Sequence, residues 1–241
     1  MGRKIHKQVQ DKSKKPKKVG RGAEAPPTHR TGGGGWMNTY TGKKAYPYDL
    51  QPDQVCIEDI AVGLSNIKRF GGMTWFSVGQ HSLNVSNSLL IGAKPDRLEP
   101  DEALLGLHGL LHDASEAYLG DLISPLKKLP MFGFYREAEA QAMKAIYIAL
   151  GLPMPDATDA SLIKIVDAAC LADEQKHLWT KGRRHPDWKQ KEGLVKTRWE
   201  RNWAAYETGG EVSERFLERY KSLWAMYQQR EKDRNLRQSH A

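Results

Sequence analysis

The stretch LLHDASEAYLGD, residues 110–121, decides how the rest of this sequence is interpreted. On an α-helix of about 100° per residue, Asp113 lies about 100° and Glu116 about 40° from His112 around the axis. One imidazole and two carboxylates therefore share one part of the helix surface, and Leu107 and Leu111 surround them with apolar side chains. Ionisable groups in an apolar setting cost free energy unless they are paired or bind a metal. The stretch thus predicts a helix that carries a functional site on its inner face.

Two other predicted helices also direct polar side chains toward an apolar face. A helical run that begins near Ser77 places His81 on its apolar face, where a core histidine bonded to a carbonyl group is the alternative. The run over residues 159–180 places Asp167 within an apolar stripe, and an inward aspartate requires a partner. Such a set of donors suits a divalent metal ion with positions left open for water and substrate. The predicted ligands are two imidazoles and two carboxylates, those of His81, His112, Asp113 and Asp167.

Helices are predicted through most of the chain. The periodic runs cover residues 55–64, with Pro52-Asp53 before this run and Asn66 as a stop after it, and residues 77–89, 100–120, 135–150, 159–180 and 212–229. Residues 181–210 combine charged side chains with three tryptophans and are predicted to form a loop followed by a helix, with no assigned role. No strand-like alternation of note is found, so the predicted fold class is all-α.

Length and composition are those of a soluble globular protein. The chain has 241 residues, of which 39% are hydrophobic and 27% charged, and its mean hydropathy is −0.65. It has no apolar run of the roughly 18 to 20 residues that a membrane span requires, and its first residues lack the apolar core of a secretory signal. We therefore expect a cytoplasmic protein without a membrane partner. The chain has two cysteines, Cys56 and Cys170, which are too few and too far apart for a disulfide framework or a cysteine metal cluster.

The net charge of +8 belongs to the N-terminal segment. Residues 1–30 hold ten Lys or Arg side chains against Asp11 and Glu24, and the rest of the chain carries equal numbers of basic and acidic groups. We expect residues 1–35 to form a basic flexible arm, with weak attraction to nucleic acid or another polyanion as the alternative. One folded domain should cover residues 36–230, and the charged end, residues 231–241, should fray.

The order and spacing of these motifs resemble a known family. His81, the His112-Asp113 pair and Asp167 are similar to the H…HD…D signature of the HD-domain metal-dependent phosphohydrolases. The segments YTGK (40–43), IEDIA (57–61), RFGG (69–72) and FSVGQHS (76–82) resemble the bacterial and phage subgroup related to 5'-deoxynucleotidases. The resemblance covers about residues 38–178, with residues 181–230 as a helical elaboration, and it implies the helical bundle of HD domains.

The resemblance also implies roles for single residues. The four predicted ligands would bind one divalent ion, for which cobalt, manganese and zinc are the first candidates and magnesium a fourth. Glu116 and Asp121 match catalytic acidic residues, and Arg69 and Phe70 stand where relatives have an Arg-Trp pair that contacts the nucleotide. Lys127 matches a lysine that reaches a phosphate, although a solvent-facing lysine is the alternative. His108 lies one helical turn before His112 and is expected to face the site as a substrate contact. The alternative is a buried structural histidine.

The activity that the resemblance implies is hydrolysis of a phosphate ester or anhydride by metal-activated water. Deoxynucleoside 5'-monophosphates are the first expected substrate, and removal of triphosphate from deoxynucleoside triphosphates such as dATP is the alternative. Hydrolysis of a cyclic or alarmone nucleotide is a third reading. The non-enzymatic hypothesis is a nucleic-acid-binding or interaction protein in which the HD site is structural. The expected partner is a deoxynucleotide, and a homo-oligomer stays open.

Overall fold

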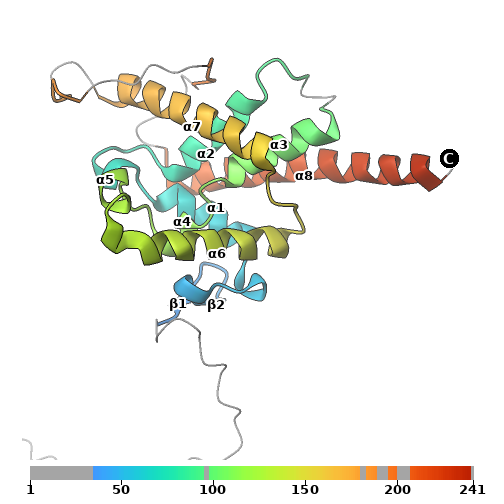
Figure 1. Ribbon diagram of the computed structural model, residues 1–241, viewed down its shortest axis with the longest axis horizontal. Coiled ribbons are helices and arrows are strands. Elements are labelled where there is room, and N and C mark those ends of the chain that lie inside the picture. Colours follow the sequence, from blue (N-terminus) through green and yellow to red (C-terminus); the bar gives the residue numbers. More distant parts are fainter. Residues whose placement is uncertain (1–34, 95–97, 180–182, 189–194, 200–206, 240–241) are drawn as a thin grey trace, which may run out of the picture. The chain divides into compact units, whose positions relative to one another are not determined.

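The residues that the structure describes are mostly helical. The computed structural model describes residues 35–94, 98–179, 183–188, 195–199 and 207–239. Figure 1 shows the helices, which are α1 (Ile57–Asn66), α2 (Val78–Leu89), α3 (Pro100–Leu111), α4 (Glu116–Leu119), α5 (Ser124–Lys127), α6 (Gly133–Leu150), α7 (Ala157–Leu178) and α8 (Gly209–Ser239). Single 3-10 turns cover Pro47–Asp49, Pro52–Gln54, Phe70–Gly72 and Pro130–Phe132. The all-α prediction is confirmed.

A short β-ribbon was not predicted. Strand β1 (Met37–Asn38) pairs antiparallel with β2 (Lys44–Ala45), so that Met37 lies opposite Ala45. Two residues in each strand are too few to give a visible alternation of apolar and polar side chains, which is why the pattern of the sequence missed them.

Helix α2 begins where the sequence predicts. The Ser77 hydroxyl accepts the Gln80 N–H at 3.1 Å, and the Gln80 amide oxygen accepts the Ser77 N–H at 2.8 Å. This reciprocal capping satisfies two backbone donors that the first turn of a helix leaves unpaired. The cap fixes the first turn of α2, and Gln80 directly precedes His81, which is fully buried.

The predicted helix over residues 100–120 is in fact divided. Helix α3 ends at Leu111 and α4 begins at Glu116. In the turn between them the Ala114 N–H bonds the Leu111 carbonyl and the Glu116 N–H bonds the Asp113 carbonyl, both at 2.9 Å, which is the tighter spacing of a 3-10 turn. The imidazole Nδ1 of His112 lies 2.8 Å from the Gly109 carbonyl, which in a continued α-helix would accept the Asp113 N–H. A side chain therefore competes with the backbone at the break.

The helix predicted from the apolar run over residues 55–64 begins two residues later than the run. A 3-10 turn covers Pro52–Gln54, Val55 and Cys56 are extended, and α1 follows. The extended residues bond to distant groups, since the Val55 carbonyl accepts from Lys43 Nζ at 2.9 Å and the Cys56 N–H donates to the Tyr118 hydroxyl at 3.3 Å. Tertiary hydrogen bonds thus replace those of a helix here.

Helices α6 and α7 agree with their predicted ranges, with one correction. Gly151 ends α6 in the left-handed conformation, at φ +64°, as the Gly-x-Pro sequence suggests. The N-cap of α7 is Asp156, whose carboxylate accepts the N–H groups of Thr158 and Asp159 at 2.8 Å. The predicted start at residue 159 therefore lies in the first turn of α7, two residues after the observed start.

The C-terminal helix supplies much of the core. Val212, Phe216 and Leu223 of α8 are fully buried, and α8 packs against α1, α2 and α3. The predicted apolar stripe is therefore correct, but the predicted end at Gln229 is wrong, because α8 continues to Ser239. Most residues of the added turns are Arg, Lys, Glu, Gln or Leu, which have good helix propensity, and Gln229 Nε2 donates to Asp233 Oδ1 at 3.3 Å one turn later.

The α2–α3 packing brings the two predicted histidines together. A Cβ on Gly109 would lie 2.3 Å from Leu89 Cδ1 and 3.3 Å from Ser86 Cα, so a larger residue would require the Leu89 side chain and the α2 backbone to shift. Gly109 lies one turn before His112, and Ser86 lies about one turn after His81 along α2. The close contact therefore sets the distance between the two imidazoles.

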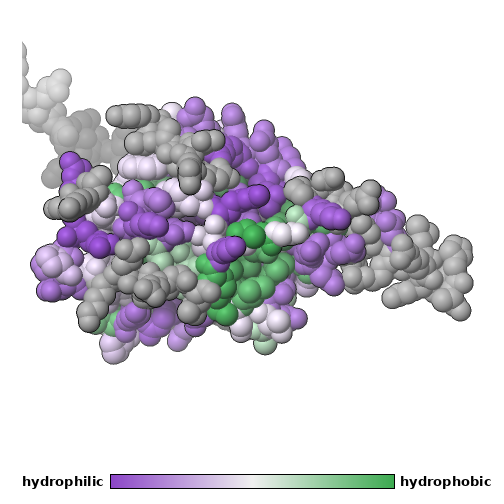
Figure 2. Space-filling view, turned by 90° about the horizontal axis from the view of Figure 1, so that it is seen from above, coloured by the Kyte–Doolittle hydropathy of each residue, from purple (hydrophilic) through white to green (hydrophobic). Residues whose placement is uncertain are grey.

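Some expectations concern parts of the chain outside the described residues. These are the basic arm, for residues 1–34, and much of the segment 181–210. Within the described part, no helix combines the length and apolar character that a membrane crossing needs. The face seen in Figure 2 is mostly hydrophilic, with a hydrophobic area near its middle.

Candidate metal centre

The two imidazoles of His81 and His112 converge on one point. Their Nε2 atoms lie 3.2 Å apart, His81 on α2 and His112 in the turn after α3. Asp113 adds an oxygen, with Oδ2 at 3.2 Å from His112 Nε2 and 3.9 Å from His81 Nε2. One ligand atom from each of these three residues lies within 4.8 Å of the other two. The group could therefore bind a metal ion.

Both imidazoles have their other nitrogen occupied. His81 Nδ1 lies 2.5 Å from Glu174 Oε1, and His112 Nδ1 lies 2.8 Å from the Gly109 carbonyl. Both partners are acceptors, so Nδ1 carries a hydrogen in each ring and Nε2 is the nitrogen left to bind a metal ion. Metal-binding histidines are oriented in this way by a carboxylate or a carbonyl behind the ring.

Asp167 brings a fourth donor from α7. Its Oδ1 lies 3.0 Å from His81 Nε2. Although burial acts in the opposite direction, the neighbouring His81 lowers the pKa of Asp167, and His112 holds the pKa of Asp113 well below its usual range. Both carboxylates are thus ionised at neutral pH. Asp113 in turn outweighs the effect of burial on His112 and raises its pKa to about 9, which shows how strongly this site attracts positive charge.

Glu174 is a functional residue that the sequence analysis missed. It is fully buried on α7, and it accepts from the Arg69 guanidinium, Nε to Oε2 at 2.9 Å, as well as from His81. Burial opposes its charge, but Arg69 and His81 lower its pKa. A signal was present, because Glu174 lies seven residues after Asp167 and hence on the same helix face. The carboxylate orients the His81 imidazole and the Arg69 guanidinium together.

Glu174→Gln is expected to weaken metal binding by about 10- to 100-fold. A glutamine amide can present its NH₂ group to His81 Nδ1, which favours the tautomer with hydrogen on Nε2 and so blocks the metal-binding lone pair. Calorimetric titration with Mn²⁺ or Co²⁺ measures the effect. Glu214→Gln, on the exposed surface of α8, is the matched control. An unchanged affinity in the Glu174 variant would contradict the orienting role.

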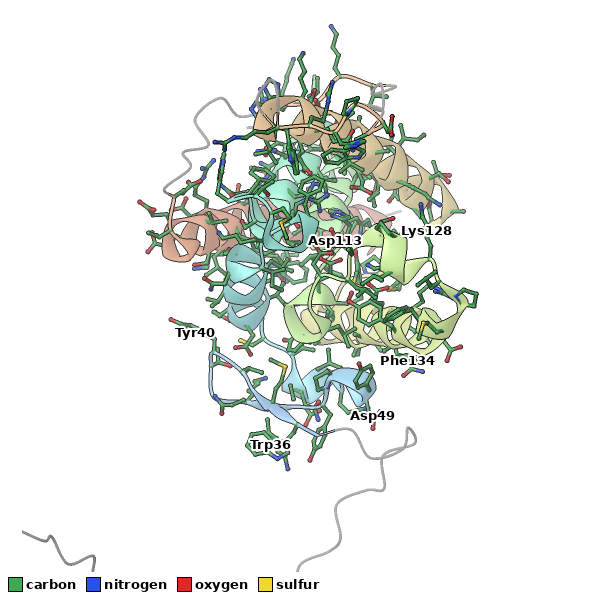
Figure 3. The ribbon with its side chains drawn as sticks, turned by 90° about the vertical axis from the view of Figure 1, so that its left-hand side faces the viewer. Trp36, Tyr40, Asp49, Asp113, Lys128 and Phe134 are labelled. Carbon is green, nitrogen blue, oxygen red and sulfur yellow. The ribbon has the colours of Figure 1, made fainter. Side chains whose placement is uncertain are left out.

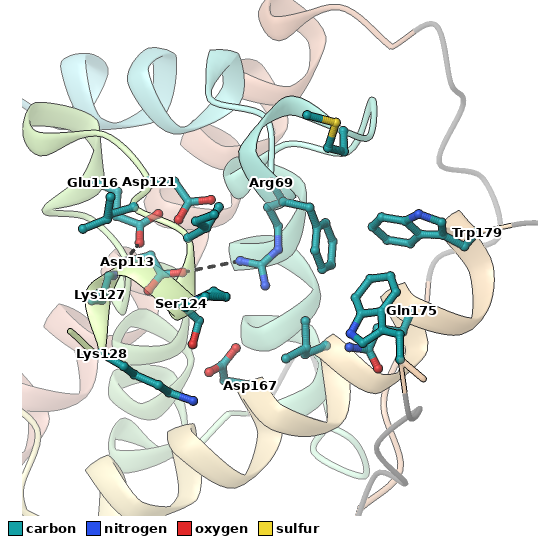
Figure 4. Close-up of a pocket in the computed structure, with 17 residues that line it drawn as sticks. Arg69, Asp113, Glu116, Asp121, Ser124, Lys127, Lys128, Asp167, Gln175 and Trp179 are labelled. Atoms are coloured by element: carbon teal, nitrogen blue, oxygen red, sulfur yellow. Dashed lines mark hydrogen bonds and ion pairs between the residues drawn. The ribbon is translucent and has the colours of Figure 1, made fainter. Parts of the chain in front are cut away.

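The two carboxylate donors, Asp113 and Asp167, line a pocket. The cavity is about 920 Å³ in volume, and Figure 4 shows Glu116, Asp121 and Lys127 on the side opposite Trp179 and Gln175. Its size is typical of sites for small organic molecules. The ionisable lining residues are Arg69, Asp113, Glu116, Asp121, Lys127, Lys128 and Asp167. Asp113 itself lies near the centre of the view in Figure 3.

Glu116 has the chemistry of a proton donor. Burial is the main reason that its pKa is raised, to about 9, and Asp113 and Asp121 add to this shift. Its Oε2 is buried without a hydrogen-bond partner in the described part of the protein, while Oε1 lies 3.4 Å from Lys127 Nζ. The pKa of Asp121 is also raised, mainly by burial. A buried carboxyl oxygen that lacks a partner beside a pocket can bond to a ligand.

Arg69 and Phe70 reach the pocket from a strained turn. Phe70 has φ +58° and is the single non-glycine residue with positive φ among those described. This conformation costs about 1–3 kcal/mol and is common at functional sites. Arg69 points inward, with Nη1 3.8 Å from Asp113 Oδ2, and Glu174 raises its pKa against the effect of burial. The turn thus places a cation and an aromatic ring side by side.

The structure places His108 away from the pocket lining. His108 is 1% exposed, and its Nδ1 lies 3.1 Å from the Tyr147 hydroxyl of α6. Burial lowers its pKa to about 4, so it is neutral at pH 7 and offers no charge to a phosphate. Its assignment as a substrate contact is therefore wrong, and the alternative, a buried structural histidine, is correct. The break after Leu111 separates His108 from the turn that carries His112.

The burial of His108 predicts a loss of stability in acid. Its folded-state pKa lies below the unfolded value, so the unfolded chain takes up the proton first and stability falls as the pH drops from about 6.5 toward 4. At pH 5 the expected contribution is about 2 kcal/mol. Urea unfolding measures the free energy of unfolding at pH 7 and at pH 5. Between these pH values it should decrease in His108→Gln by about 2 kcal/mol less than in the unaltered chain. Equal decreases in the two chains would refute the role of His108.

Fold and site together define an all-helical protein with a His-Asp group that could bind a metal ion. No family model matches the chain. The chain is 34% identical over 145 residues to the uncharacterized protein YfdR of Escherichia coli K12. The matched residues make up 59% of this chain and 72% of YfdR. An uncharacterized protein of Rhodobacter capsulatus is 36% identical over 122 residues, 49% of this chain and 59% of that protein. The chain belongs to the YfdR family.

Proposed function

We propose that this protein is a metal-dependent phosphohydrolase of the HD type that removes phosphate from deoxynucleoside 5'-monophosphates. One observation carries the proposal. The Nε2 atoms of His81 and His112 lie 3.2 Å apart, both with their Nδ1 atoms engaged behind the ring, and the adjoining Asp113 and Asp167 line a pocket that also holds a Glu116 oxygen without a hydrogen-bond partner among the described residues. A structural His-Asp cluster would have no need of a pocket of this size or of a buried carboxyl group without a partner.

The donor set fits a divalent cation. Two imidazole nitrogens and two carboxylate oxygens suit Zn²⁺, Mn²⁺ and Co²⁺, and the residues that would hold the ion are His81, His112, Asp113 and Asp167. Such an ion lowers the pKa of water and offsets negative charge on a phosphoryl group. The cluster supplies the complementary negative charge, because both aspartates remain ionised at neutral pH.

The other residues would bind the substrate and transfer a proton. In the hydrolysis, a water oxygen joins phosphorus, the bond from phosphorus to the 5'-oxygen breaks, and the leaving oxygen takes a proton. Glu116, protonated near neutral pH because of its raised pKa, would supply that proton from its carboxyl group. The guanidinium of Arg69 and the ammonium of Lys127 would bond to phosphoryl oxygens.

The charge of the pocket favours one phosphate over three. Its described lining includes three cationic side chains, and two of them already have carboxylate partners. Arg69 is paired with Glu174 at 2.9 Å and Lys127 with Glu139 at 2.7 Å. A triphosphate would bring about four negative charges, which this lining compensates less well than the two charges of a monophosphate.

A substrate panel tests the proposal. Chelator-treated protein is reloaded separately with Co²⁺, Mn²⁺, Zn²⁺ or Mg²⁺ and offered ribo- and deoxynucleoside mono- and triphosphates, and the released phosphate is identified. Metal-dependent release of inorganic phosphate from deoxynucleoside monophosphates supports it. Release of tripolyphosphate from dATP would instead favour a triphosphohydrolase, and no release with any metal would refute both.

A further inference from the structure

The pocket has an aromatic end for which the proposed hydrolysis has no use. Phe70, Trp179 and Trp188 line it. The ring centroids of Phe70 and Trp179 are 4.6 Å apart, and those of Trp179 and Trp188 are 4.7 Å apart, with interplanar angles of 84° and 90°. Phe70 and Trp188 are 6.1 Å apart at 79°. Three aromatic rings thus support one another edge to face at one end of a partly open cavity.

The consecutive residues Arg69 and Phe70 connect the aromatic end of the pocket to its charged end. The Arg69 side chain extends toward Asp113, and its neighbour Phe70 contacts Trp179, as Figure 4 shows for the labelled Arg69, Asp113 and Trp179. The guanidinium carbon of Arg69 lies 5.7 Å from the centroid of the Phe70 ring, so the cation and the aromatic end adjoin. A ligand whose phosphate lies at the carboxylate and imidazole cluster would therefore extend its other end toward the rings.

We infer that the aromatic end binds the flat base of a nucleotide, with Trp179 as its main contact. The inference rests on the proposed phosphohydrolase function and names the part of the substrate that would select it. Nucleobases stack on aromatic side chains whatever their sequence, and Gln175 in the same lining has an amide that can both donate and accept a hydrogen bond at a base edge. A quaternary ammonium ligand fits less well, because it requires several ring faces around a common centre, whereas these rings meet edge to face.

The experiment compares a nucleotide with the same phosphate ester lacking its base. With metal-loaded protein, KM and kcat are measured for dAMP and for 2-deoxyribose 5-phosphate. The unaltered chain should show a KM for dAMP lower by about 10-fold or more. Trp179→Ala should raise the KM for dAMP by about 10-fold, with little change in kcat and none for 2-deoxyribose 5-phosphate. Trp179→Phe, which keeps an aromatic face, should restore most of the affinity.

The matched control is Trp36→Ala. Trp36 precedes β1, is 56% exposed and lies outside the pocket lining, so its loss should leave both KM values unchanged. Equal KM values for the two substrates in the unaltered chain, or an equal rise of both in Trp179→Ala, would overturn the inference. Preference for phosphocholine over dAMP would also overturn it.

A binding measurement separates this inference from the proposed function. If neither ester is hydrolysed, the phosphohydrolase proposal fails, and quenching of tryptophan fluorescence by dAMP decides the inference alone. Quenching by dAMP that persists in Trp36→Ala and is lost in Trp179→Ala would support an aromatic base site. No quenching in the unaltered chain would overturn it.

Discussion

A His112→Ala chain is expected to bind a divalent cation at least about 100-fold more weakly than the unaltered chain and to lose measurable hydrolysis with it. His112 Nε2 lies 3.2 Å from both His81 Nε2 and Asp113 Oδ2, so it is central to the group. Loss of a residue behind a metal ligand alone weakens binding by about 10- to 100-fold, and loss of the ligand itself should cost no less.

Thermal unfolding measures this effect without any assay of activity. A ligand at 100 times its Kd stabilises a folded protein by about 2.7 kcal/mol, so Tm of the unaltered chain should rise on addition of Mn²⁺ or Co²⁺. The His112→Ala chain should show no such rise at the same concentration. His185→Ala is the matched control, because the His185 side chain is 73% exposed. A metal-dependent rise of Tm that persisted in His112→Ala would exclude His112 as a ligand.

Glu116→Gln is expected to keep the metal and lose turnover by about 10²- to 10⁴-fold on a deoxynucleoside monophosphate. Gln has nearly the shape of Glu but cannot donate a proton to the leaving oxygen from a carboxyl group. The metal-dependent rise of Tm should be the same as in the unaltered chain, because the assigned metal ligands do not include Glu116. A combination of normal metal binding and slow turnover therefore distinguishes a proton donor from a ligand.

The leaving group provides a second measurement for Glu116. p-Nitrophenolate leaves without a proton, so the loss in Glu116→Gln should shrink to less than about 10-fold with p-nitrophenyl phosphate. Glu137→Gln, on the exposed side of α6, is the matched control and should leave both activities unchanged. An equal loss with both substrates would show that Glu116 does not act as the acid.

Much of the helical framework could be predicted from the sequence. The reciprocal cap at Ser77 and the glycine after α6 act within a few residues, and the apolar stripe of α8 repeats with the period of a helix. The division after Leu111 could not be predicted, because the apolar pattern of residues 100–120 continues across it. Competition of the His112 imidazole for a backbone carbonyl decides that break.

In the candidate site too, the directions of side chains could be predicted from the sequence, but their tertiary partners could not. Periodicity placed His81 and Asp167 on inner helix faces, but it also pointed His108 at the site, where the structure pairs it with Tyr147 instead. Glu174 shares the face of Asp167, yet its role depends on Arg69, 105 residues earlier in the chain. A pattern within one helix gives the direction of a side chain but not the partner that meets it.

Helix period and capping are short-range properties of the chain, so the order of amino acids was enough to predict a helical protein and the helix faces that carry imidazoles and carboxylates. Three features depend on packing between segments: the two Nε2 atoms meet at 3.2 Å, Glu174 lies behind one of them, and three aromatic rings line one end of the pocket. Those distances depend on how closely α2, α3 and α7 pack, and close packing is decided by side-chain volumes across helices, as at Gly109, which no single segment specifies.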